Sequence, residues 1–375
     1  MLIACNARFL IRDKLEGIGW FTYEALKRMV TQHPEHNFAF FFDRPFDPSF
    51  LFAPNVKGYV LPPPARHPWL WKLWFDLSVP YMLRKLKADV FLSTDGFASL
   101  HTRCRQVVVM HDLAFEHFQD HVPPGVLRYY RHNTPRFAAK ASRLATVSSF
   151  TKNDLVNRYA VSPDKIDVVF NGSSDRFRML SDAEKAEVRL RFSGGKPYFL
   201  YAGAMHPRKN TTRLFRAFAD FKKKTGSALK LVIAGRRAWS TDEAMKTWEN
   251  MPFKEEVIFL GHLNRDELTL VMGAAYALVY PSLFEGFGIP IVEAMHCGVP
   301  VITSNVSSMP EVAGDAALLV NPYEEKEISA AMVQLAEDAA LYKKLAAAGL
   351  KQQEQFSWAS TGDRLWECIE RAMRQ

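Results

Sequence analysis

Short apolar runs separated by helical stretches recur along the whole chain, and this alternation most restricts the possible folds. Continuous hydrophobicity within a run, rather than at every second residue, is typical of parallel strands covered on both faces. Strand and helix in alternation predict an α/β protein with parallel sheets. The twelve predicted strands are residues 2–5, 38–42, 89–93, 106–110, 144–148, 166–170, 198–203, 229–235, 256–261, 276–282, 300–304 and 317–320.

Twelve strands are too many for one compact sheet of ordinary size. The 375 residues suit two doubly wound domains of about 180 residues each. We place these domains at residues 1–180 and 181–355, because a loop, a charged helix and a Gly-Gly turn lie close to that boundary. Residues 356–375 are predicted to be an amphipathic helix. Its apolar contact residues are Trp358, Leu365, Trp366 and Ile369.

The composition excludes several classes of protein. Apolar residues make up 48% of the chain and charged residues 23%, so the chain can bury a core and is not a disordered tail. No apolar run reaches the roughly 18 residues needed to span a bilayer, and the first residues lack the pattern of a secretory signal. The four cysteines are too few and too far apart for a disulfide framework or a zinc knuckle. We therefore expect a protein of the reducing cytosol.

The formal net charge of +8 lies entirely in the N-terminal half. Residues 1–180 hold 24 Lys and Arg against 16 Asp and Glu, whereas residues 181–375 hold 24 of each kind. A basic half suits an anionic membrane surface, a phosphorylated substrate or nucleic acid, and it also suits a merely solubilising surface. No nucleic-acid-binding module is recognisable, so we expect no nucleic-acid partner.

Three tryptophans lie close together between Trp69 and Phe75, beside several basic residues. Such a segment can lie at a membrane interface. Leu70, Trp74 and Leu77 also fit one buried helix face, and this core interpretation is favoured over the membrane one. The sequence leaves both interpretations open.

Two carboxylates eight residues apart, Glu285 and Glu293, enclose the most informative motif of the chain. Gly286 and Gly288 permit tight turns and the close approach of a ligand, and Pro290 suits the first turn of a helix. Glu285 is therefore expected in a loop after a strand, and Glu293 about one turn into the next helix. Ligands of open α/β sheets bind at that edge, and backbone N–H groups at a helix start attract anions.

A basic loop from Gly203 to Asn210 follows another predicted strand and precedes a helix. Its residues Arg208 and Lys209 lie beside a helix N-terminus, where cations are poorly placed unless an anion lies between. A diphosphate would be attracted both by the helix N-terminus and by the two cations, because Arg offers a planar fork and Lys a point charge to phosphate oxygens. A solvated basic loop is the alternative.

His111 and the segment Gly17-Ile-Gly19 are two further candidate site elements in the N-terminal half. His111 directly follows the strand 106–110, where its ring can bind a sugar hydroxyl, shuttle a proton or bond to nearby backbone. Gly17-Ile-Gly19 departs from a dinucleotide-binding fingerprint and is expected to be a flexible loop that caps a helix starting near Phe21. The chain contains no Asp-x-Asp and no zinc spacing of His and Cys, so neither a metal nor another cofactor is expected.

These motifs, in this order, resemble those of the family-four retaining glycosyltransferases of the GT-B fold. The resemblance covers nearly the whole chain, and Glu-x7-Glu with the upstream Arg-Lys-Asn is its most specific part. It implies two Rossmann-like domains facing each other across a cleft, the first for the acceptor and the second for a nucleotide-sugar, with a C-terminal helix that crosses back to the first. The motifs are Gly17-Ile-Gly19, His111-Asp-Leu113, Thr146-Val-Ser-Ser149, Asn171-Gly172, GAMHPRKN (203–210), IAGRR (233–237), FLGHL (259–263), YPSLFEGFGIPIVEAM (280–295) and PEVAG (310–314).

The resemblance implies roles for the residues that match these motifs. Arg208 and Lys209 are implied to hold the diphosphate of the donor. His111 and Glu285 are implied to contact the donor sugar, which completes a catalytic set of four. Glu293 is implied to bind the ribose hydroxyls. The implied donor-binding residues are Gly17, Gly19, Gly203, Asn210, Glu285, Gly286, Phe287, Gly288, Ile289 and Glu293.

The resemblance also implies the reaction. A sugar moves, with retention of its anomeric configuration and without a metal, from a nucleotide-sugar to a glycan or lipid-linked glycan acceptor in polysaccharide synthesis. The sequence offers no well-placed protein nucleophile, so attack on the same face is favoured. The stretches 95–100, 111–118 and 284–295 resemble bacterial polysaccharide and O-antigen mannosyltransferases, which implies GDP-mannose as donor. We expect a cytoplasmic enzyme that contacts the anionic inner face of the cell membrane.

Three alternatives stay open. A UDP-sugar can replace the GDP-sugar as donor. A nucleotide-sugar 2-epimerase of the same architecture is not expected to combine the Arg-Lys-Asn loop with Glu-x7-Glu, and it would form product without an acceptor. A non-catalytic scaffold would be expected to have lost one of His111, Arg208, Lys209 or Glu285, and the chain keeps all four.

Overall fold

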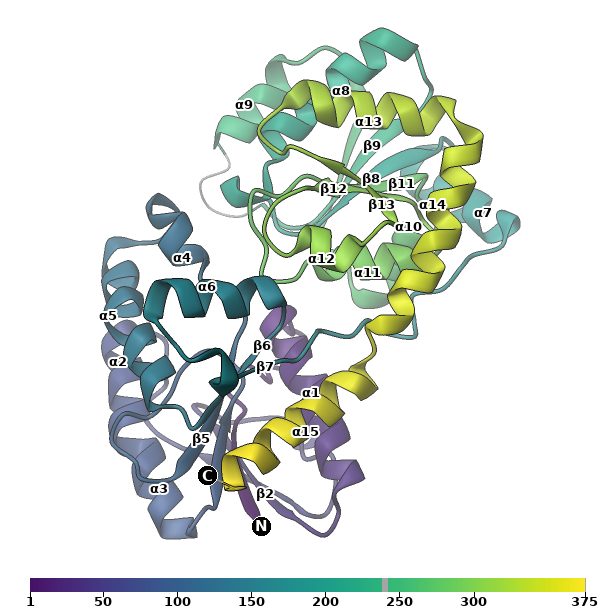
Figure 1. Cartoon of the computed structure of the whole chain (residues 1–375). Helices are drawn as coiled ribbons and strands as arrows, with labels where there is room; N and C mark the ends of the chain where they lie inside the picture. The colour runs from purple at the N-terminus through teal and green to yellow at the C-terminus, as the bar shows by residue number, and fades with distance from the viewer. Residues whose placement is uncertain (238–241, 375) are drawn as a thin grey trace. The chain divides into compact units, whose positions relative to one another are not determined.

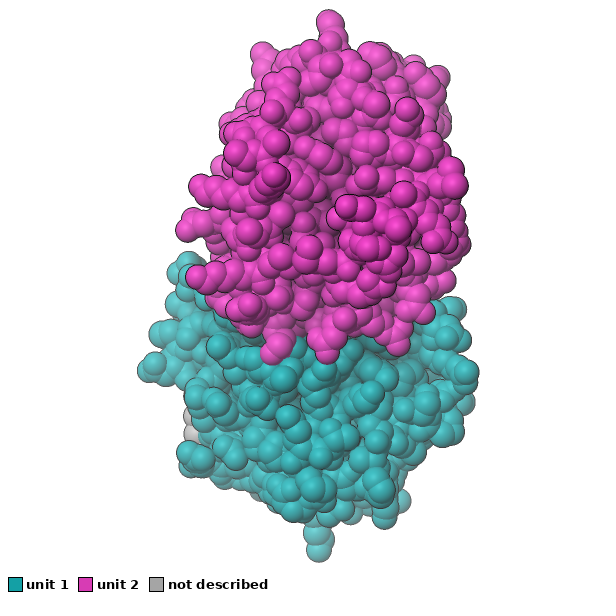
Figure 2. Space-filling model, turned by 90° about the vertical axis from the view of Figure 1, so that its right-hand side faces the viewer, with its two compact units in different colours: residues 1–171, 358–375 teal, residues 172–357 magenta. Residues whose placement is uncertain are grey.

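The computed structural model describes residues 1–237 and 242–374. The chain divides into two compact units, which Figure 2 colours separately. Unit 1 comprises Met1–Asn171 and the C-terminal helix from Trp358, and unit 2 comprises Gly172–Ser357. Each unit is built on one parallel sheet with helices on both of its faces (Figure 1).

Unit 1 contains a seven-stranded sheet. Its strands are β1 (Leu2–Asn6), β2 (Asn37–Phe42), β3 (Val56–Val60), β4 (Val90–Ser93), β5 (Arg105–Met110), β6 (Arg143–Thr146) and β7 (Ile166–Val168). They pair in parallel in the order β3-β2-β1-β4-β5-β6-β7. The winding therefore reverses between β1 and β4, and such a reversal is where doubly wound folds bind their ligands.

Helices cover both faces of the unit 1 sheet. They are α1 (Gly17–Gln32), α2 (Pro68–Leu73), the π-helical turn η2 (Trp74–Ser78), α3 (Val79–Leu86), α4 (Ala114–His117), α5 (Pro124–Lys140), α6 (Ser149–Tyr159) and α15 (Trp358–Arg374). On one face, buried side chains such as Trp74 and Phe137 pack against Phe91 and Val108 of the sheet. Helices α1 and α15 pack together on the opposite face (Figure 1).

Unit 2 repeats this plan with six strands. They are β8 (Tyr198–Ala202), β9 (Lys230–Ala234), β10 (Val257–Gly261), β11 (Ala277–Tyr280), β12 (Val301–Ser304) and β13 (Ala317–Val320). The strand order β10-β9-β8-β11-β12-β13 is again fully parallel, and its reversal lies between β8 and β11. The helices are α7 (Asp182–Ser193), the 3-10 turn η5 (Pro207–Lys209), α8 (Thr211–Thr225), α9 (Asp242–Asn250), α10 (Arg265–Gly273), α11 (Ile289–His296), α12 (Met309–Ala313), α13 (Glu325–Glu337) and α14 (Ala339–Gln352).

The predicted fold class, two doubly wound α/β domains with parallel sheets, is confirmed, and every one of the twelve predicted strands is present. The sequence analysis missed strand β3. Its residues include Lys57 and Gly58, so β3 offers no continuous apolar run. Strand β3 lies at the edge of the sheet and is defined by its backbone pairing with β2, which local sequence does not reveal.

The boundary between the units lies after Asn171, nine residues before the expected position. Residues 172–180 belong to unit 2 because they pack against α10. Arg176 forms an ion pair with Asp266 at 2.6 Å. The side chain of Leu180 lies so close to Gly273 that a Cβ atom on that glycine would be 2.8 Å from it.

The C-terminal helix α15 packs within unit 1 against α1 and the sheet. The apolar contact residues expected from its periodicity, Trp358, Leu365, Trp366 and Ile369, are all buried. The ring of Trp366 stacks on His33 of α1 with a centroid distance of 3.5 Å. Helix α15 thus contributes buried side chains along its length to the core of unit 1, which begins at Met1.

The aromatic segment around α2 is divided between core and surface. Trp74 and Phe75 are fully buried, which confirms the core interpretation for these two residues. Leu77 was expected on the same buried face, and this expectation is wrong, because Leu77 is 63% exposed. The π-helical turn η2 shifts the helical phase at this point, so the spacing of three between Trp74 and Leu77 no longer places both on one face.

Candidate functional site

The basic loop and the Glu285 loop of unit 2 follow strands β8 and β11, which are neighbours at the switch point of the sheet. Parallel neighbours end at the same edge, so both loops emerge together. The N–H of Leu283 donates to the carbonyl oxygen of Arg208 at 2.8 Å. The Nδ2 group of Asn210 donates to the carbonyl oxygens of Pro281 at 2.9 Å and Pro322 at 2.7 Å. Asn210 therefore joins segments that follow three different strands.

Glu285 lies at the centre of a buried cluster of charged groups. Its carboxylate accepts a hydrogen bond from Nζ of Lys209 at 2.6 Å and another from the hydroxyl of Tyr280 at 2.8 Å. Lys209 Nζ also lies 2.6 Å from the Tyr280 hydroxyl oxygen, so the three groups form a closed triangle. The guanidinium of Arg208 lies 3.5 Å from Glu285 and donates to the carbonyl oxygen of Phe284.

The cluster keeps a surplus positive charge. Burial alone would raise the pKa of Glu285, but the charges of Lys209 and Arg208 outweigh burial and lower that pKa to about 2. The carboxylate is thus ionised at every physiological pH. One carboxylate stands against two cations, so the cluster carries a net charge of +1. Two cations beside one carboxylate at the carboxyl edge of the sheet suit an anionic ligand such as a phosphate.

Two serines position the loop that carries Glu285. The Ser308 hydroxyl donates to the carbonyl oxygens of Glu285 at 2.9 Å and Phe287 at 3.0 Å. The N–H of Glu285 donates to the Ser307 hydroxyl at 3.1 Å. Gly288 ends the loop as the N-cap residue of α11, and its φ of +100° is a conformation that a side chain would strain. Gly286 and Phe287 are buried within the loop, and Ile289 is the first residue of α11.

A close approach between two backbones shapes the basic loop. Gly203 has a φ of +140°, and its N–H donates to the carbonyl oxygen of Ala234 at 2.8 Å. A Cβ atom on Gly235 would lie 1.8 Å from the carbonyl oxygen of Gly203. Only glycine therefore fits at position 235, and the IAGRR segment holds the start of the basic loop in place.

Glu293 lies about one turn into α11, as the sequence analysis expected. Its side chain is half-buried. Burial raises the pKa of Glu293 to about 7, although the charge of Arg265 opposes the shift. The two carboxylates of the motif therefore differ strongly in acidity: Glu285 is a fixed anion, and Glu293 is partly protonated near neutral pH.

Three of the predicted site residues belong to unit 1. His111 follows β5, and its Nε2 lies 2.7 Å from the carbonyl oxygen of Thr94. A carbonyl only accepts, so Nε2 carries the proton and Nδ1 is the basic nitrogen. Burial lowers the pKa of His111, which favours this neutral form. Gly17 and Gly19 lie in the first turn of α1, so the expectation of a loop that caps a helix near Phe21 is wrong.

The first turn of α1 packs closely against the segment before it through Gly19. A Cβ atom on Gly19 would lie 3.0 Å from the carbonyl oxygen of Phe9, so the first turn of α1 packs tightly on the segment that follows β1. Packing of α1 there offsets the low intrinsic helix propensity of its two glycines. Open space surrounds Gly17, where a Cβ atom would meet nothing within 4 Å.

Comparison with known proteins matches both units to glycosyltransferases. Residues 15–175 match the family Glycosyltransferase Family 4, and residues 182–352 match Glycosyl transferases group 1. O-antigen chain mannosyltransferase B of Escherichia coli is 30% identical over 359 residues, which span 93% of this chain and 94% of the relative. The chain is a family-four glycosyltransferase.

Two further similarities agree with this assignment. The O-antigen chain mannosyltransferase RfbU of Salmonella typhimurium is 33% identical over 230 residues, 60% of each chain. The structure of Anabaena Alr3699/HepE in complex with UDP and glucose superimposes with a TM-score of 0.76, at 18% identity, over 99% of both chains. The glycosyltransferase thus has the GT-B fold.

The sequence analysis missed Tyr280 of the glycosyltransferase. Its hydroxyl bridges Lys209 and Glu285, although the whole residue is buried. A buried tyrosine needs a hydrogen-bond partner, so its place at the end of β11, five residues before Glu285, was a usable signal.

A buried ion pair at the switch point of unit 1 also escaped prediction. Arg8 follows β1 and donates from Nε to Asp95, which follows β4, at 2.5 Å. The guanidinium lies 4.4 Å from the ring centroid of Phe97. Nothing in the local sequence links the two charges, because 87 residues separate them.

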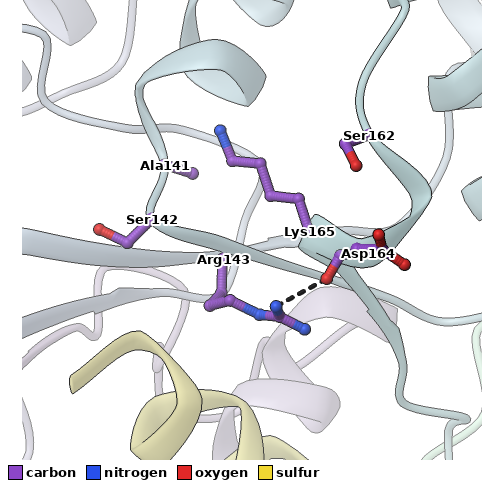
Figure 3. A pocket seen from close by; sticks show the side chains of 6 residues that line it. All are labelled: Ala141, Ser142, Arg143, Ser162, Asp164 and Lys165. Atoms are coloured by element: carbon purple, nitrogen blue, oxygen red, sulfur yellow. Dashed lines mark hydrogen bonds between the residues drawn. The ribbon is translucent and has the colours of Figure 1, made fainter. Parts of the chain in front are cut away.

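The described residues contain no metal-binding cluster, and the polar pocket of unit 1 is occupied by its own ion pairs and hydrogen bonds. No group of three or more His, Cys, Asp or Glu side chains in residues 1–237 and 242–374 is placed to hold a metal ion. Figure 3 shows a polar pocket of about 470 Å³ in unit 1, lined by Ala141, Ser142, Arg143, Ser162, Asp164 and Lys165. Its cations are already engaged: Arg143 binds Asp167 at 2.7 Å, and Lys165 donates to the carbonyl oxygen of Ala138 at 2.9 Å.

Proposed function

We propose that this glycosyltransferase moves mannose from GDP-mannose to a glycan or lipid-linked glycan acceptor during polysaccharide synthesis. The main support for a nucleotide-sugar donor is the cluster of Arg208, Lys209 and Glu285. These three groups together have a net positive charge and lie at a topological switch point. The names of the relatives from Escherichia coli and Salmonella typhimurium support mannose.

The proposed chemistry begins with cleavage of the bond between the anomeric carbon and the phosphate oxygen. The bonding electrons remain on the diphosphate, and the sugar develops oxocarbenium character. Arg208 and Lys209 would stabilise the charge that grows on the diphosphate, as preorganised donors do in other transition states. The acceptor hydroxyl attacks the same face of the sugar, and its proton passes to a diphosphate oxygen, so the anomeric configuration is retained.

The remaining residues would bind the donor. Glu293 would accept hydrogen bonds from the ribose hydroxyls, and its partly protonated state suits a neutral diol partner. His111, with Nδ1 as its basic nitrogen, would contact a hydroxyl of the donor sugar. Gly17 and Gly19 would let the start of α1 approach the diphosphate without side chains in the way.

We also propose that the reaction needs no metal. The pair Arg208 and Lys209 supplies two positive charges at the position where a divalent cation would otherwise neutralise the diphosphate.

A lipid-linked acceptor would place the enzyme at the cytoplasmic face of the cell membrane. No helix within residues 1–237 and 242–374 has the length and apolar character required to cross a bilayer.

A thermal-shift panel with GDP, UDP and ADP tests the donor. A nucleotide at about 100 times its dissociation constant stabilises the folded state by about 2.7 kcal/mol, which is readily measured. We expect GDP to raise Tm more than UDP or ADP. Selective stabilisation by UDP would contradict the GDP-mannose proposal and favour a UDP-sugar. Formation of product from the nucleotide-sugar without an acceptor would favour a 2-epimerase.

A further inference from the structure

The segment 66–87 of unit 1, which includes α2, η2 and α3 (Figure 1), presents a row of large apolar side chains to solvent. Trp69, Leu77 and Tyr81 are 64%, 63% and 66% exposed, and Leu73 is 37% exposed. Among the described residues, these four make up four of the eleven exposed large apolar residues, yet they lie within 13 positions. Scattered apolar residues are normal on a surface, whereas a cluster of this kind marks an interaction site.

We call Trp69, Leu73, Leu77 and Tyr81 the apolar stripe. In an α-helix, a spacing of four residues passes a full turn by about 40°, so such a row would drift around the helix. In the π-helical turn η2, the N–H of Val79 bonds to the carbonyl oxygen of Trp74, five residues back. This wider turn counteracts the drift. A shallow pocket of about 460 Å³ is lined by Trp69, Lys72, Leu73, Asp76, Leu77 and His101.

Basic side chains flank the apolar stripe. The segment 66–87 contains five basic residues and one acidic residue, so its net charge is 5 − 1 = +4. The acidic residue, Asp76, is half-buried and lies 3.7 Å from His101. All five basic residues are exposed: Arg66, Lys72, Arg84, Lys85 and Lys87.

We propose that the apolar stripe and its basic flank form the surface by which unit 1 docks on an anionic lipid bilayer. Trp and Tyr side chains favour the headgroup region, and long cationic side chains reach lipid phosphates while their stems cover apolar surface. Attraction between basic groups and anionic lipids adds to the burial of apolar area. In a symmetric dimer through this face, two segments that each carry a net charge of +4 would lie against each other and repel. Charge therefore favours an anionic lipid surface over a second copy of the chain.

This inference rests on the proposed use of a lipid-linked acceptor, because a docked unit 1 would hold the enzyme where such an acceptor is found. The full chain is mixed with phosphatidylcholine vesicles, with and without phosphatidylglycerol, and sedimented at low and high salt. We expect binding only to the anionic vesicles, and weaker binding at high salt, since salt screens surface attraction.

Matched variants identify the surface. The pair Trp69→Ser with Leu77→Ser should weaken vesicle binding about tenfold or more, because two large apolar contacts are lost. The pair Lys85→Glu with Lys87→Glu should abolish the preference for anionic lipid. The control pair Leu190→Ser with Tyr323→Ser removes apolar side chains of similar exposure from unit 2 and should leave binding unchanged.

A spectroscopic readout reports insertion directly. Brominated lipid should quench part of the tryptophan emission of the bound protein. Trp69→Phe should keep the binding but remove most of that quenching, because Trp74 is buried and Trp71 is half-buried. Unchanged quenching in Trp69→Phe would place the contact elsewhere and overturn the proposal.

Three further results would overturn it: no vesicle binding at low salt, equal loss of binding in the unit 2 control, or a concentration-dependent dimer that the stripe variants abolish. The last result would assign the stripe to an interface between copies.

Thermal shift with GDP in the same proteins separates this inference from the proposed function. Variants that lose vesicles but keep the GDP shift support a docking surface distinct from the donor site. Vesicle binding without any nucleotide shift would leave the docking surface standing and contradict the proposed donor.

Discussion

Lys209 donates a 2.6 Å hydrogen bond to Glu285 within a largely buried site, so the cation proposed for the diphosphate is already paired before any donor binds. The carboxylate orients the ammonium group and neutralises half of the positive charge contributed by Arg208 and Lys209. A ligand anion therefore meets a preorganised cation rather than a solvated one, which lowers the cost of rearrangement during the reaction.

Replacing Arg208 or Lys209 by Ala should lower kcat about 100- to 1000-fold, by analogy with the removal of one oxyanion donor. Arg208→Lys should also lower kcat, because the planar fork is lost. Steady-state kinetics with GDP-mannose, measured beside Tm, check this.

These variants leave Glu285 with fewer partners, so stability needs its own control. Combining Lys209→Ala with Glu285→Gln removes the buried charge that has lost its nearest cation, and it should restore Tm without restoring kcat. Folded Arg208→Ala and Lys209→Ala proteins with near-normal kcat would exclude the leaving-group role.

Tyr280→Phe should lower kcat more than it raises the donor KM, because the hydroxyl group that is lost fixes the positions of the Lys209 and Glu285 side chains by hydrogen bonds. The stability cost should be about 1 kcal/mol for a lost buried hydrogen bond. Tyr198→Phe is the matched control: its buried hydroxyl donates to the carbonyl oxygen of Val271 at 2.7 Å, away from the charged cluster. If both variants lower kcat equally, Tyr280 has only a structural role.

Glu293→Gln tests the unusual acidity of this carboxyl. Burial raises the pKa of Glu293 to about 7 in the folded protein, above its ordinary value of 4.5. Folding therefore favours the protonated form. The stability that Glu293 contributes is fully present below pH 4.5 and is lost as the pH rises from 4.5 through about 7. Glu293→Gln should be more stable than the parent by roughly 2–3 kcal/mol at pH 8 and equally stable at pH 4.

The same variant should mainly raise the donor KM, since ribose contacts change little while the sugar leaves. Urea unfolding at the two pH values and donor kinetics measure the two effects. A constant stability difference at all pH values would contradict the raised pKa, and a fall in kcat alone would contradict a ribose contact.

Gly235→Ala should destabilise unit 2 by more than about 3 kcal/mol, because the new Cβ atom would lie 1.8 Å from the carbonyl oxygen of Gly203. Activity should fall even in the folded fraction, since the basic loop must move. Gly125→Ala is a suitable comparison: its Cβ atom would meet nothing within 4 Å, so Tm should stay within a few degrees of the parent. Equal Tm values for the two variants would show that the backbones can separate without cost.

Transfer should continue at an unchanged rate in excess EDTA, because Arg208 and Lys209 supply the charge that a divalent metal would bring. Apoprotein prepared by chelation and dialysis, assayed with and without magnesium or manganese, checks this. Activity that EDTA abolishes and either metal restores would refute metal independence.

Local sequence was sufficient to predict the fold class and the position of the motifs that follow β8 and β11. Buried parallel strands need uninterrupted apolar side chains, and loops after them need glycine, so strands such as β8 and β11 and the loops that carry Lys209 and Glu285 could be read from short windows. Strand β3 could not, because it exists through its pairing with β2. Similarly, α1 begins four residues before the expected start, and its first turn packs through Gly19 against the carbonyl oxygen of Phe9.

The chemistry of the site depended on contacts that no window contains. The two carboxylates of the Glu285–Glu293 motif are identical in sequence terms, but Lys209 and Arg208 reach Glu285 from another strand and lower its pKa, whereas burial raises that of Glu293. The Arg8–Asp95 pair likewise joins charges 87 residues apart. Sequence by itself determined which residues stand at the ends of the strands. Only the tertiary structure decided which of them are charged, paired and buried, because Coulomb interactions and desolvation depend on distances in space rather than on separation along the chain.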